Sequence, residues 1–151
     1  MTVRAMTYTA AVAIAAIVSA SAFAASTAPT RSTASAKLKA FLTVNQEIPA
    51  PTGASGTGTF TATVTGKTIK FRLTFTGLTG PATAAHIHAA LAGKANPVPA
   101  VPLCSPCKNG QTGTVTASAA VMKKILGGAT YVNVHTKNNA GGEVRGQIAS
   151  I

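Results

Sequence analysis

The chain has 151 residues, of which 13 are lysine or arginine and only two are acidic, for a formal net charge of +11. The two acids, Glu47 and Glu143, lie far apart in the sequence and there is no aspartate, which disfavours enzymes that use paired carboxylates or a Ser/His/Asp triad. Tryptophan is absent and aromatic residues make up 5% of the chain, so a base-stacking surface for single-stranded nucleic acid is not expected.

The N-terminus has the three parts of a secretory signal peptide. A basic start ends at Arg4, a short apolar run covers 10–18, and the small-residue pattern AFA follows at 22–24. We expect cleavage after Ala24, which removes residues 1–24 and sends the protein to the periplasm or the cell exterior. The alternative is that this segment stays as an N-terminal anchor. No other segment is long and apolar enough to span a membrane.

Residues 25–36 are rich in Ser, Thr and Ala and have no apolar period, so we predict a flexible leader there. From residue 37 the pattern has a period of two, with Leu, Ala, Val, Ile and Phe alternating with Lys, Arg and Thr. Such alternation is typical of half-buried antiparallel strands. Strands are predicted at 37–44, 59–65, 68–75, 82–89, 113–117, 130–136 and 143–148, with a hairpin turn at Gly66.

Two segments depart from this pattern. Ser118–Leu126 reads SAAVMKKIL and has helical spacing, a Ser or Thr to cap its start, and Gly127 and Gly128 to end it, so we predict a short crossover helix. Residues 90–112 hold four prolines and both cysteines without any period, which predicts a long loop. The whole pattern predicts an all-β domain over 37–151, an antiparallel Greek-key sandwich or barrel.

The three histidines lie on two predicted strands. His86 and His88 are two residues apart in AHIH, so both project from the same face, with Cα atoms about 6.6 Å apart and Ile87 in the core. In YVNVHT the valines take the core face, which places His135 on the outer face as well. If the strands are neighbours, the three imidazoles form an external site for copper or zinc.

The alternative for these histidines is that each hydrogen-bonds to loop backbone and binds nothing. Neither histidine segment contains a carboxylate, so the groups that orient a ligating ring must be backbone carbonyls, Asn133 or Thr136.

The cysteines form the motif CSPC, with Cys104 and Cys107 three residues apart. In an exported protein two lone cysteines pair with each other, and we predict this disulfide. The loop it closes is very short, so its main effect is to stiffen the proline-rich segment. The alternative is that the thiolates bind copper or zinc together with the histidines.

The positive charges are spread along the predicted strands. Because lysine and arginine alternate there with apolar residues, the simplest interpretation is a solvated, aggregation-resistant surface. A second interpretation is adhesion to an anionic polymer of the cell envelope. Export makes nucleic acid an unexpected partner.

Three phrases occur in a family-specific order: LTVNQEIPAPTGASGTGTF, FTGLTGPATAAHIHAA and GGATYVNVHTKNNAGGEVRGQI. With them the sequence resembles the CHRD domain, first described in chordin, over residues 37–151. The resemblance implies an extracellular β-domain, and the family's motif residues map onto His86, His88, His135, Glu143 and Arg145. The loop after HIH is usually glycine-rich in the family, whereas here it reads AALAGKANPVPAVPLCSPC.

A fainter similarity is to copper/zinc superoxide dismutase, a Greek-key barrel with a His-x-His strand and a metal site outside the barrel. The fold is therefore expected to be immunoglobulin-like or superoxide-dismutase-like. A binuclear centre is excluded by the count of ligands, since the chain has no aspartate and no fourth histidine.

We predict an exported CHRD-type domain, a non-catalytic binding or structural module of the cell envelope or extracellular space that requires no cofactor. Its partner is an unknown extracellular or envelope component, and the sequence does not indicate an oligomeric state. The alternative function is a mononuclear copper or zinc protein that uses His86, His88 and His135, with metal handling or redox chemistry as its role. Glu143 and Arg145 are expected on the polar face of the 130–136/143–148 hairpin as a solvated pair.

Overall fold

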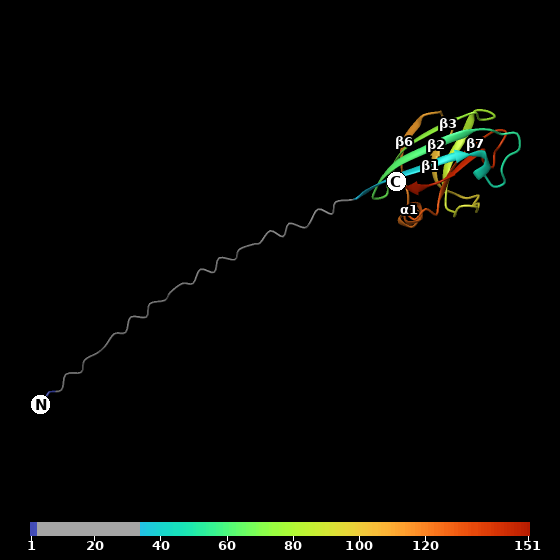
Figure 1. The fold of residues 1–151 in the computed structure, drawn as a ribbon. Helices are drawn as coiled ribbons and strands as arrows, with labels where there is room; N and C mark the ends of the chain where they lie inside the picture. Colours follow the sequence, from blue (N-terminus) through green and yellow to red (C-terminus); the bar gives the residue numbers. More distant parts are fainter. Residues whose placement is uncertain (3–33) are drawn as a thin grey trace. The chain divides into compact units, whose positions relative to one another are not determined.

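The computed structural model of this protein describes residues 1–2 and 34–151 (Figure 1). The predicted signal peptide and nearly all of the predicted leader therefore lie outside the described residues, apart from the first two residues and 34–36. Within the described residues, no helix has both the length and the apolar character needed to cross a membrane.

Residues 34–151 fold into one antiparallel sheet. Its strands are β1 (Ser35–Thr43), β2 (Thr57–Thr65), β3 (Thr68–Thr76), β4 (Ala82–His88), β5 (Pro99–Cys104), β6 (Gln111–Thr116), β7 (Tyr131–Thr136), β8 (Val144–Gln147) and β9 (Ala149–Ser150). The strand order is β5-β4-β7-β8-β1-β2-β3-β6, and β9 pairs with β1. Because β5 and β6 at the two ends of this order contact each other, the sheet is nearly closed into a barrel. The predicted all-β antiparallel fold is confirmed.

The alternation in the sequence explains which side of the sheet faces inward. In β1 the side chains of Leu38, Ala40 and Leu42 are buried, while Lys37 on the opposite face of the strand is exposed. Strands β2 and β3 follow the same rule; β2 pairs with β1, and β3 pairs with the other edge of β2 (Figure 1). The core is thus the inside of the barrel, lined by one face of every long strand.

Two short elements complete the fold. A single 3-10 turn, η1 (Val44–Gln46), follows β1, and the helix α1 (Ala119–Leu126) connects β6 to β7. The Ser118 side chain accepts a hydrogen bond from the backbone N–H of Val121 and so caps α1. The helix buries Met122 and Ile125, which confirms the predicted crossover helix.

The prediction of one long loop over residues 90–112 is wrong. Residues 99–104 form β5, which pairs with β4, and residues 111–112 already belong to β6. β5 lies at the end of the strand order, where proline is tolerated because an outward-facing N–H is not needed for pairing. Because two of the six residues of β5 are prolines, its sequence lacks the alternation of apolar and polar residues that marks the other strands. The last residue of β5, Cys104, forms a disulfide with Cys107.

The two histidine-bearing strands are neighbours. β7 forms the predicted hairpin with β8, in a register that sets Val134 opposite Val144. On its other side β7 pairs with β4, so that AHIH and YVNVHT run antiparallel next to each other. The three-histidine site was predicted on the condition that these two strands are neighbours. Their pairing meets that condition and determines the geometry of the candidate site.

Candidate metal centre

Strand register places the three histidines on one face of the sheet. His88 lies opposite Tyr131, His86 lies opposite Asn133, and His135 lies opposite Ala84. Ile87, on the other face of β4, is fully buried in the barrel core. The side chains that alternate away from the core on β4 and β7 therefore collect in a single cluster, which we call the histidine cluster (His86, His88 and His135).

The rings of the histidine cluster converge. One ring nitrogen from each residue can be chosen so that all three lie within 4.8 Å of one another. Nδ1 of His86 is 3.1 Å from Nε2 of His135, and the His86 and His88 ring centroids are 5.7 Å apart. Three imidazoles at such spacing match the ligand set that copper and zinc accept in proteins.

The orientation of His135 is fixed by its neighbours. Its Nδ1 lies 3.0 Å from the carbonyl oxygen of Ala140, which can only accept, so Nδ1 carries the proton and donates it. In this tautomer Nε2 carries a lone pair and accepts a hydrogen bond from Nδ1 of His86 when that nitrogen is protonated. Oδ1 of Asn133 also lies 3.0 Å from Nε2 of His135, but an amide oxygen only accepts, so this contact is a hydrogen bond only when Nε2 carries a proton. A carbonyl that holds one ring nitrogen while the other keeps its lone pair is the usual support of a ligating histidine.

His88 is the unusual member of the cluster. Its side chain is only 3% exposed, and neither ring nitrogen has a hydrogen-bond partner in the structure. The ring stacks on Tyr131, with centroids 5.0 Å apart and planes within 7°. Buried polar groups without a partner are rare in folded proteins, and each one calls for a specific explanation.

The surroundings of His86 and His88 favour their neutral imidazoles. Burial lowers the pKa of His86, and the neighbouring charges of His135 and His88 lower it further. Burial also lowers the pKa of His88, more than the nearby backbone of Asn96 raises it. Because metals bind the unprotonated ring, both shifts make the nitrogens available at neutral pH.

The histidine cluster is not fully open to solvent, because a loop covers part of it. Residues 89–98, here called the covering loop, fold back over β7 and β8. The hydroxyl of Tyr131 donates to the carbonyl of Asn96, and Gln147 donates to the carbonyl of Ala90. This cover is why His88 is buried, while His86 and His135 stay partly exposed.

Comparison with protein families adds one result to this geometry. The family model for the CHRD domain matches residues 38–148. The chain belongs to the CHRD-domain family. No curated protein and no solved structure gives a match. The similarity to copper/zinc superoxide dismutase therefore remains a prediction from the histidine pattern alone.

The matched region of the CHRD domain contains both glutamates, and the structure corrects the expectation for one of them. Glu143 and Arg145 are not a solvated pair, since they are 0% and 2% exposed. The Glu143 carboxylate accepts from the backbone N–H and hydroxyl of Thr79, from the hydroxyl of Thr136 and from Asn139, at 2.6 to 2.9 Å. Burial alone raises the pKa of Glu143, but these hydrogen bonds together outweigh it and lower the pKa.

Arg145 has different partners. Its guanidinium lies 3.5 Å from the ring centroid of Tyr131 and donates to the carbonyl of Lys94 at 2.6 Å. Arg145 thus connects the hairpin β7–β8 to the covering loop, and Tyr131 lies between Arg145 and His88. In this CHRD domain Arg145 supports the wall of the histidine cluster, while Glu143 and Thr136 anchor the turn that follows β7.

Sequence reasoning missed Glu47 as part of the site. This residue is 6% exposed, its carboxylate accepts from the amide nitrogen of Asn133 at 3.5 Å, and the amide oxygen of Asn133 faces His135, so Asn133 lies between Glu47 and His135. Burial raises the pKa of Glu47, and the hydrogen bond from Ile48 only partly compensates. Glu47 follows η1, far from both histidine segments in sequence, and no spacing rule could place it there.

A cavity of about 410 Å³ opens beside the cluster. Its walls include His88, His135, Asn133, Tyr131 and Glu47. The cysteines take no part, because the described part of the chain holds no free cysteine and both thiols are used in the disulfide. The alternative in which thiolates join the histidines is therefore not available in this structure.

Proposed function

We propose that this protein is an exported binding module without catalysis of its own, and that its ligand is a single copper or zinc ion held by His86, His88 and His135. The observation that carries the proposal is the buried ring of His88. Leaving a buried polar group without a partner costs about 1–3 kcal/mol. A metal ion in the cluster gives one of its nitrogens a partner and offsets that cost.

Export is supported by three independent features. The N-terminal sequence has the form of a signal peptide, Cys104 and Cys107 form a disulfide, and the CHRD resemblance implies an extracellular module. An exported copper or zinc site fits a protein that holds or hands over metal in the periplasm or outside the cell. Such a role needs no general acid or base.

The geometry requires only a small adjustment to hold an ion. Ligands at about 2.1 Å from one ion lie at most about 4.2 Å apart. The cluster nitrogens lie within 4.8 Å of one another, so a modest ring rotation brings them together. Three nitrogen ligands leave a position open, and the neighbouring cavity is where a further ligand or an exchange partner would approach.

Calorimetric titration of the mature chain with Cu²⁺ and with Zn²⁺ tests the proposal. The wild type is expected to bind one ion per chain, and the His86→Ala/His88→Ala double variant is expected to lose binding. Absence of binding for both metals in the wild type contradicts the metal proposal and returns the domain to the purely structural role.

A second variant separates ligand loss from unfolding. His88→Phe replaces the imidazole with a slightly larger apolar ring that can stack on Tyr131 in the same way, and it removes both nitrogens. We expect this variant to be at least as stable as the wild type without metal and to bind metal at least tenfold more weakly. Unchanged affinity in His88→Phe contradicts the assignment of His88 as a ligand.

A further inference from the structure

The outer face of β1, β2 and β3 carries a regular array of cations and threonines. Strand register aligns side chains across the three strands into rows that point away from the core. Two adjacent rows read Lys37–Thr63–Lys70 and Lys39–Thr61–Arg72. Cations in one row are about 9.6 Å apart across two strands, and the rows are about 6.7 Å apart along them. We call this surface the threonine–cation face.

The threonines extend the same face at both ends. A third row sets Phe41 opposite Thr59, and Thr59 opposite Thr74. β6 continues the two cation rows with Thr114 and Thr112. The face is therefore broad, hydroxyl-rich and made of regular strands, whose backbone holds the spacing of the charges.

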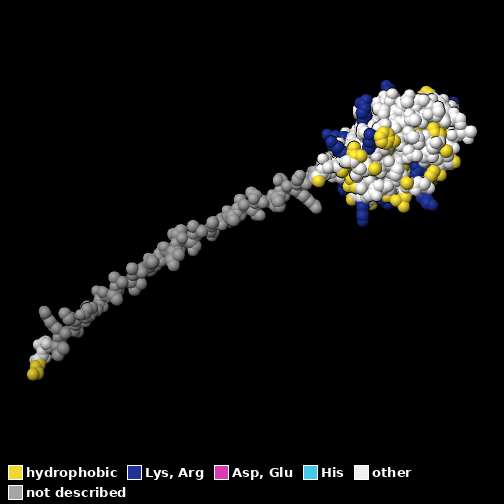
Figure 2. Space-filling model, viewed as in Figure 1, with side chains coloured by type: hydrophobic (Ala, Val, Ile, Leu, Met, Phe, Trp, Pro, Cys, Tyr) yellow, Lys and Arg dark blue, Asp and Glu magenta, His cyan; other side chains and the backbone are white. Residues whose placement is uncertain are grey.

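No acidic side chain counters these cations at the surface of the described residues. The chain has only two acidic residues, Glu47 and Glu143, and both are buried near the histidine cluster. Figure 2 shows lysine and arginine projecting from the domain, with no acidic side chain visible on that side. The charged side chains exposed on residues 34–151 are thus all positive, which attracts a polyanion.

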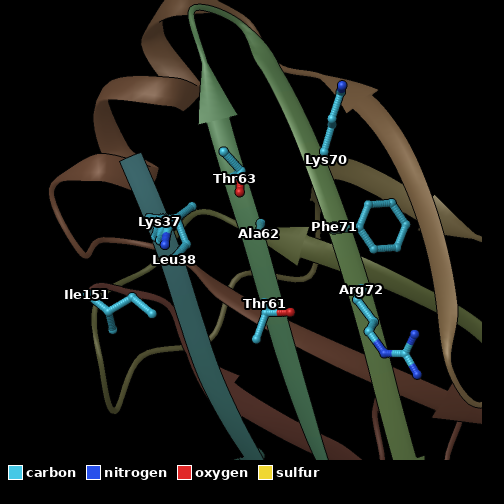
Figure 3. Close-up of a pocket in the computed structure, with 9 residues that line it drawn as sticks. All are labelled: Lys37, Leu38, Thr61, Ala62, Thr63, Lys70, Phe71, Arg72 and Ile151. Atoms are coloured by element: carbon cyan, nitrogen blue, oxygen red, sulfur yellow. The ribbon is translucent and has the colours of Figure 1, made fainter. Parts of the chain in front are cut away.

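A shallow depression crosses the array. It has a volume of about 290 Å³. Five members of the two cation rows line it, together with four other residues: Lys37, Thr61, Thr63, Lys70 and Arg72, with Leu38, Ala62, Phe71 and Ile151. Figure 3 shows Lys37, Lys70 and Arg72 around the hydroxyl-bearing Thr61 and Thr63, arising from three adjacent strands. An elongated ligand lying across the strands meets alternating ammonium or guanidinium groups and hydroxyls.

Phe41 supplies an apolar contact at the edge of the array. Its ring is 62% exposed, although the same sequence buries other phenylalanines in the core. The Nζ atom of Lys39 lies 4.2 Å from the ring centroid. An exposed aromatic ring beside a cation and hydroxyl groups suits the apolar face of a sugar ring that carries an acidic group nearby.

We propose that the threonine–cation face binds an acidic polysaccharide. The positive groups pair with its carboxylates or other anionic groups, the threonines with its hydroxyls, and Phe41 with a ring face. A lipid surface fits less well, because membrane-binding surfaces insert several large apolar side chains and this face offers one aromatic ring. Nucleic acid fits less well, because single strands are held on stacked aromatic platforms. The surface lies on other strands than the histidine cluster, so the inference does not depend on metal binding.

Surface plasmon resonance with immobilised polygalacturonate, a linear polyuronate, tests this inference on the mature chain. We expect saturable binding that weakens with salt, and no binding to neutral dextran. In Lys39→Gln/Arg72→Gln, the dissociation constant should rise about tenfold, and the slope of log affinity against log salt should fall by up to about two. Phe41→Thr should weaken binding without changing the salt slope.

The matched control removes the same charge elsewhere. Lys123→Gln/Lys124→Gln, on exposed positions of α1, should change the dissociation constant less than about twofold. An equal loss in both double variants overturns the proposal, since net charge alone would then explain binding. Failure to bind polygalacturonate also overturns it, as does tighter binding to phosphatidylglycerol vesicles or to duplex DNA. Circular dichroism and thermal unfolding of each variant establish that the fold is intact.

Discussion

The two glutamates show how environment sets the behaviour of identical side chains. Both are buried, yet Glu143 accepts four short hydrogen bonds and Glu47 has only weaker contacts with Ile48 and Asn133. Hydrogen bonds to the charged form lower a pKa, while burial raises it. The pKa of Glu143 is accordingly lowered and that of Glu47 is raised. Glu143 therefore stabilises the folded state as a carboxylate, and ionised Glu47 opposes it.

We predict that Glu143→Gln lowers the free energy of unfolding by about 2–3 kcal/mol at pH 7, because the amide group places donors against the donors of Thr79, Thr136 and Asn139. The folded-state pKa of Glu143 lies below its unfolded value of about 4.3, so its stabilising effect is complete above that value. The effect is lost as the pH falls through the folded-state pKa. Urea unfolding at several pH values should show wild type and variant converging in acid.

Glu47→Gln is the matched control with the opposite sign. The folded-state pKa of Glu47 lies above its unfolded value, so its contribution to stability declines as the pH rises through the folded-state pKa. The stability of the variant relative to wild type should therefore increase between about pH 4 and pH 7. The same acid-induced convergence in both variants would contradict the distinction between the two sites.

For individual residues, the sequence alone predicted part of the histidine cluster. The period of two in AHIH and YVNVHT correctly puts His86, His88 and His135 on the side of their strands away from the core. It does not show that His88 is buried, because the covering loop that buries it packs through contacts distant in sequence. Glu47 was missed for the same reason.

The strand elements were predictable wherever one face is buried and the other exposed. β1, β2 and β3 keep strict alternation, and the helix α1 has its own period and cap. β5 escaped prediction because its prolines interrupt the pattern at a sheet edge, where proline is tolerated. Edge position is a property of the assembled sheet, and local sequence does not encode it.

We predict that the disulfide stiffens the edge of the sheet more than it stabilises the domain. Cys107 also donates its backbone N–H to Ala82 at the start of β4, so the segment after β5 stays attached without the disulfide. Cys104→Ser/Cys107→Ser should lower the free energy of unfolding by at most about 2 kcal/mol. Hydrogen exchange should become faster in β5 and stay unchanged in β2. Global unfolding of the variant would contradict this account.

Gly146 is predicted to be essential for the contact of β8 with β1. A Cβ atom built there would fall on the carbonyl group of Phe41, whose backbone cannot move without separating the strands. Gly146→Ala should lower the free energy of unfolding by about 2 kcal/mol or more, measured by urea denaturation. Gly53→Ala, at a turn with open space, is the comparison: it tests backbone strain alone and should cost less. Equal effects would contradict the steric explanation.

At the scale of the whole molecule, the barrel presents different chemistry on its two sides. β4 and β7 carry the histidine cluster, which the covering loop partly buries, whereas β1, β2 and β3 carry the threonine–cation face. This division fits the two proposals together: the threonine–cation face attaches the domain to an acidic polysaccharide, and the histidine cluster on other strands binds the metal ion.

The central claim is that the histidine cluster holds one metal ion, and anomalous X-ray diffraction from crystals grown with zinc or copper tests it most directly. The account predicts a single strong anomalous peak about 2.1 Å from one nitrogen each of His86, His88 and His135. Crystals of His88→Phe should lack that peak or show it weakened. A wild-type crystal with no peak among the three rings, or with its metal bound elsewhere, would contradict the account.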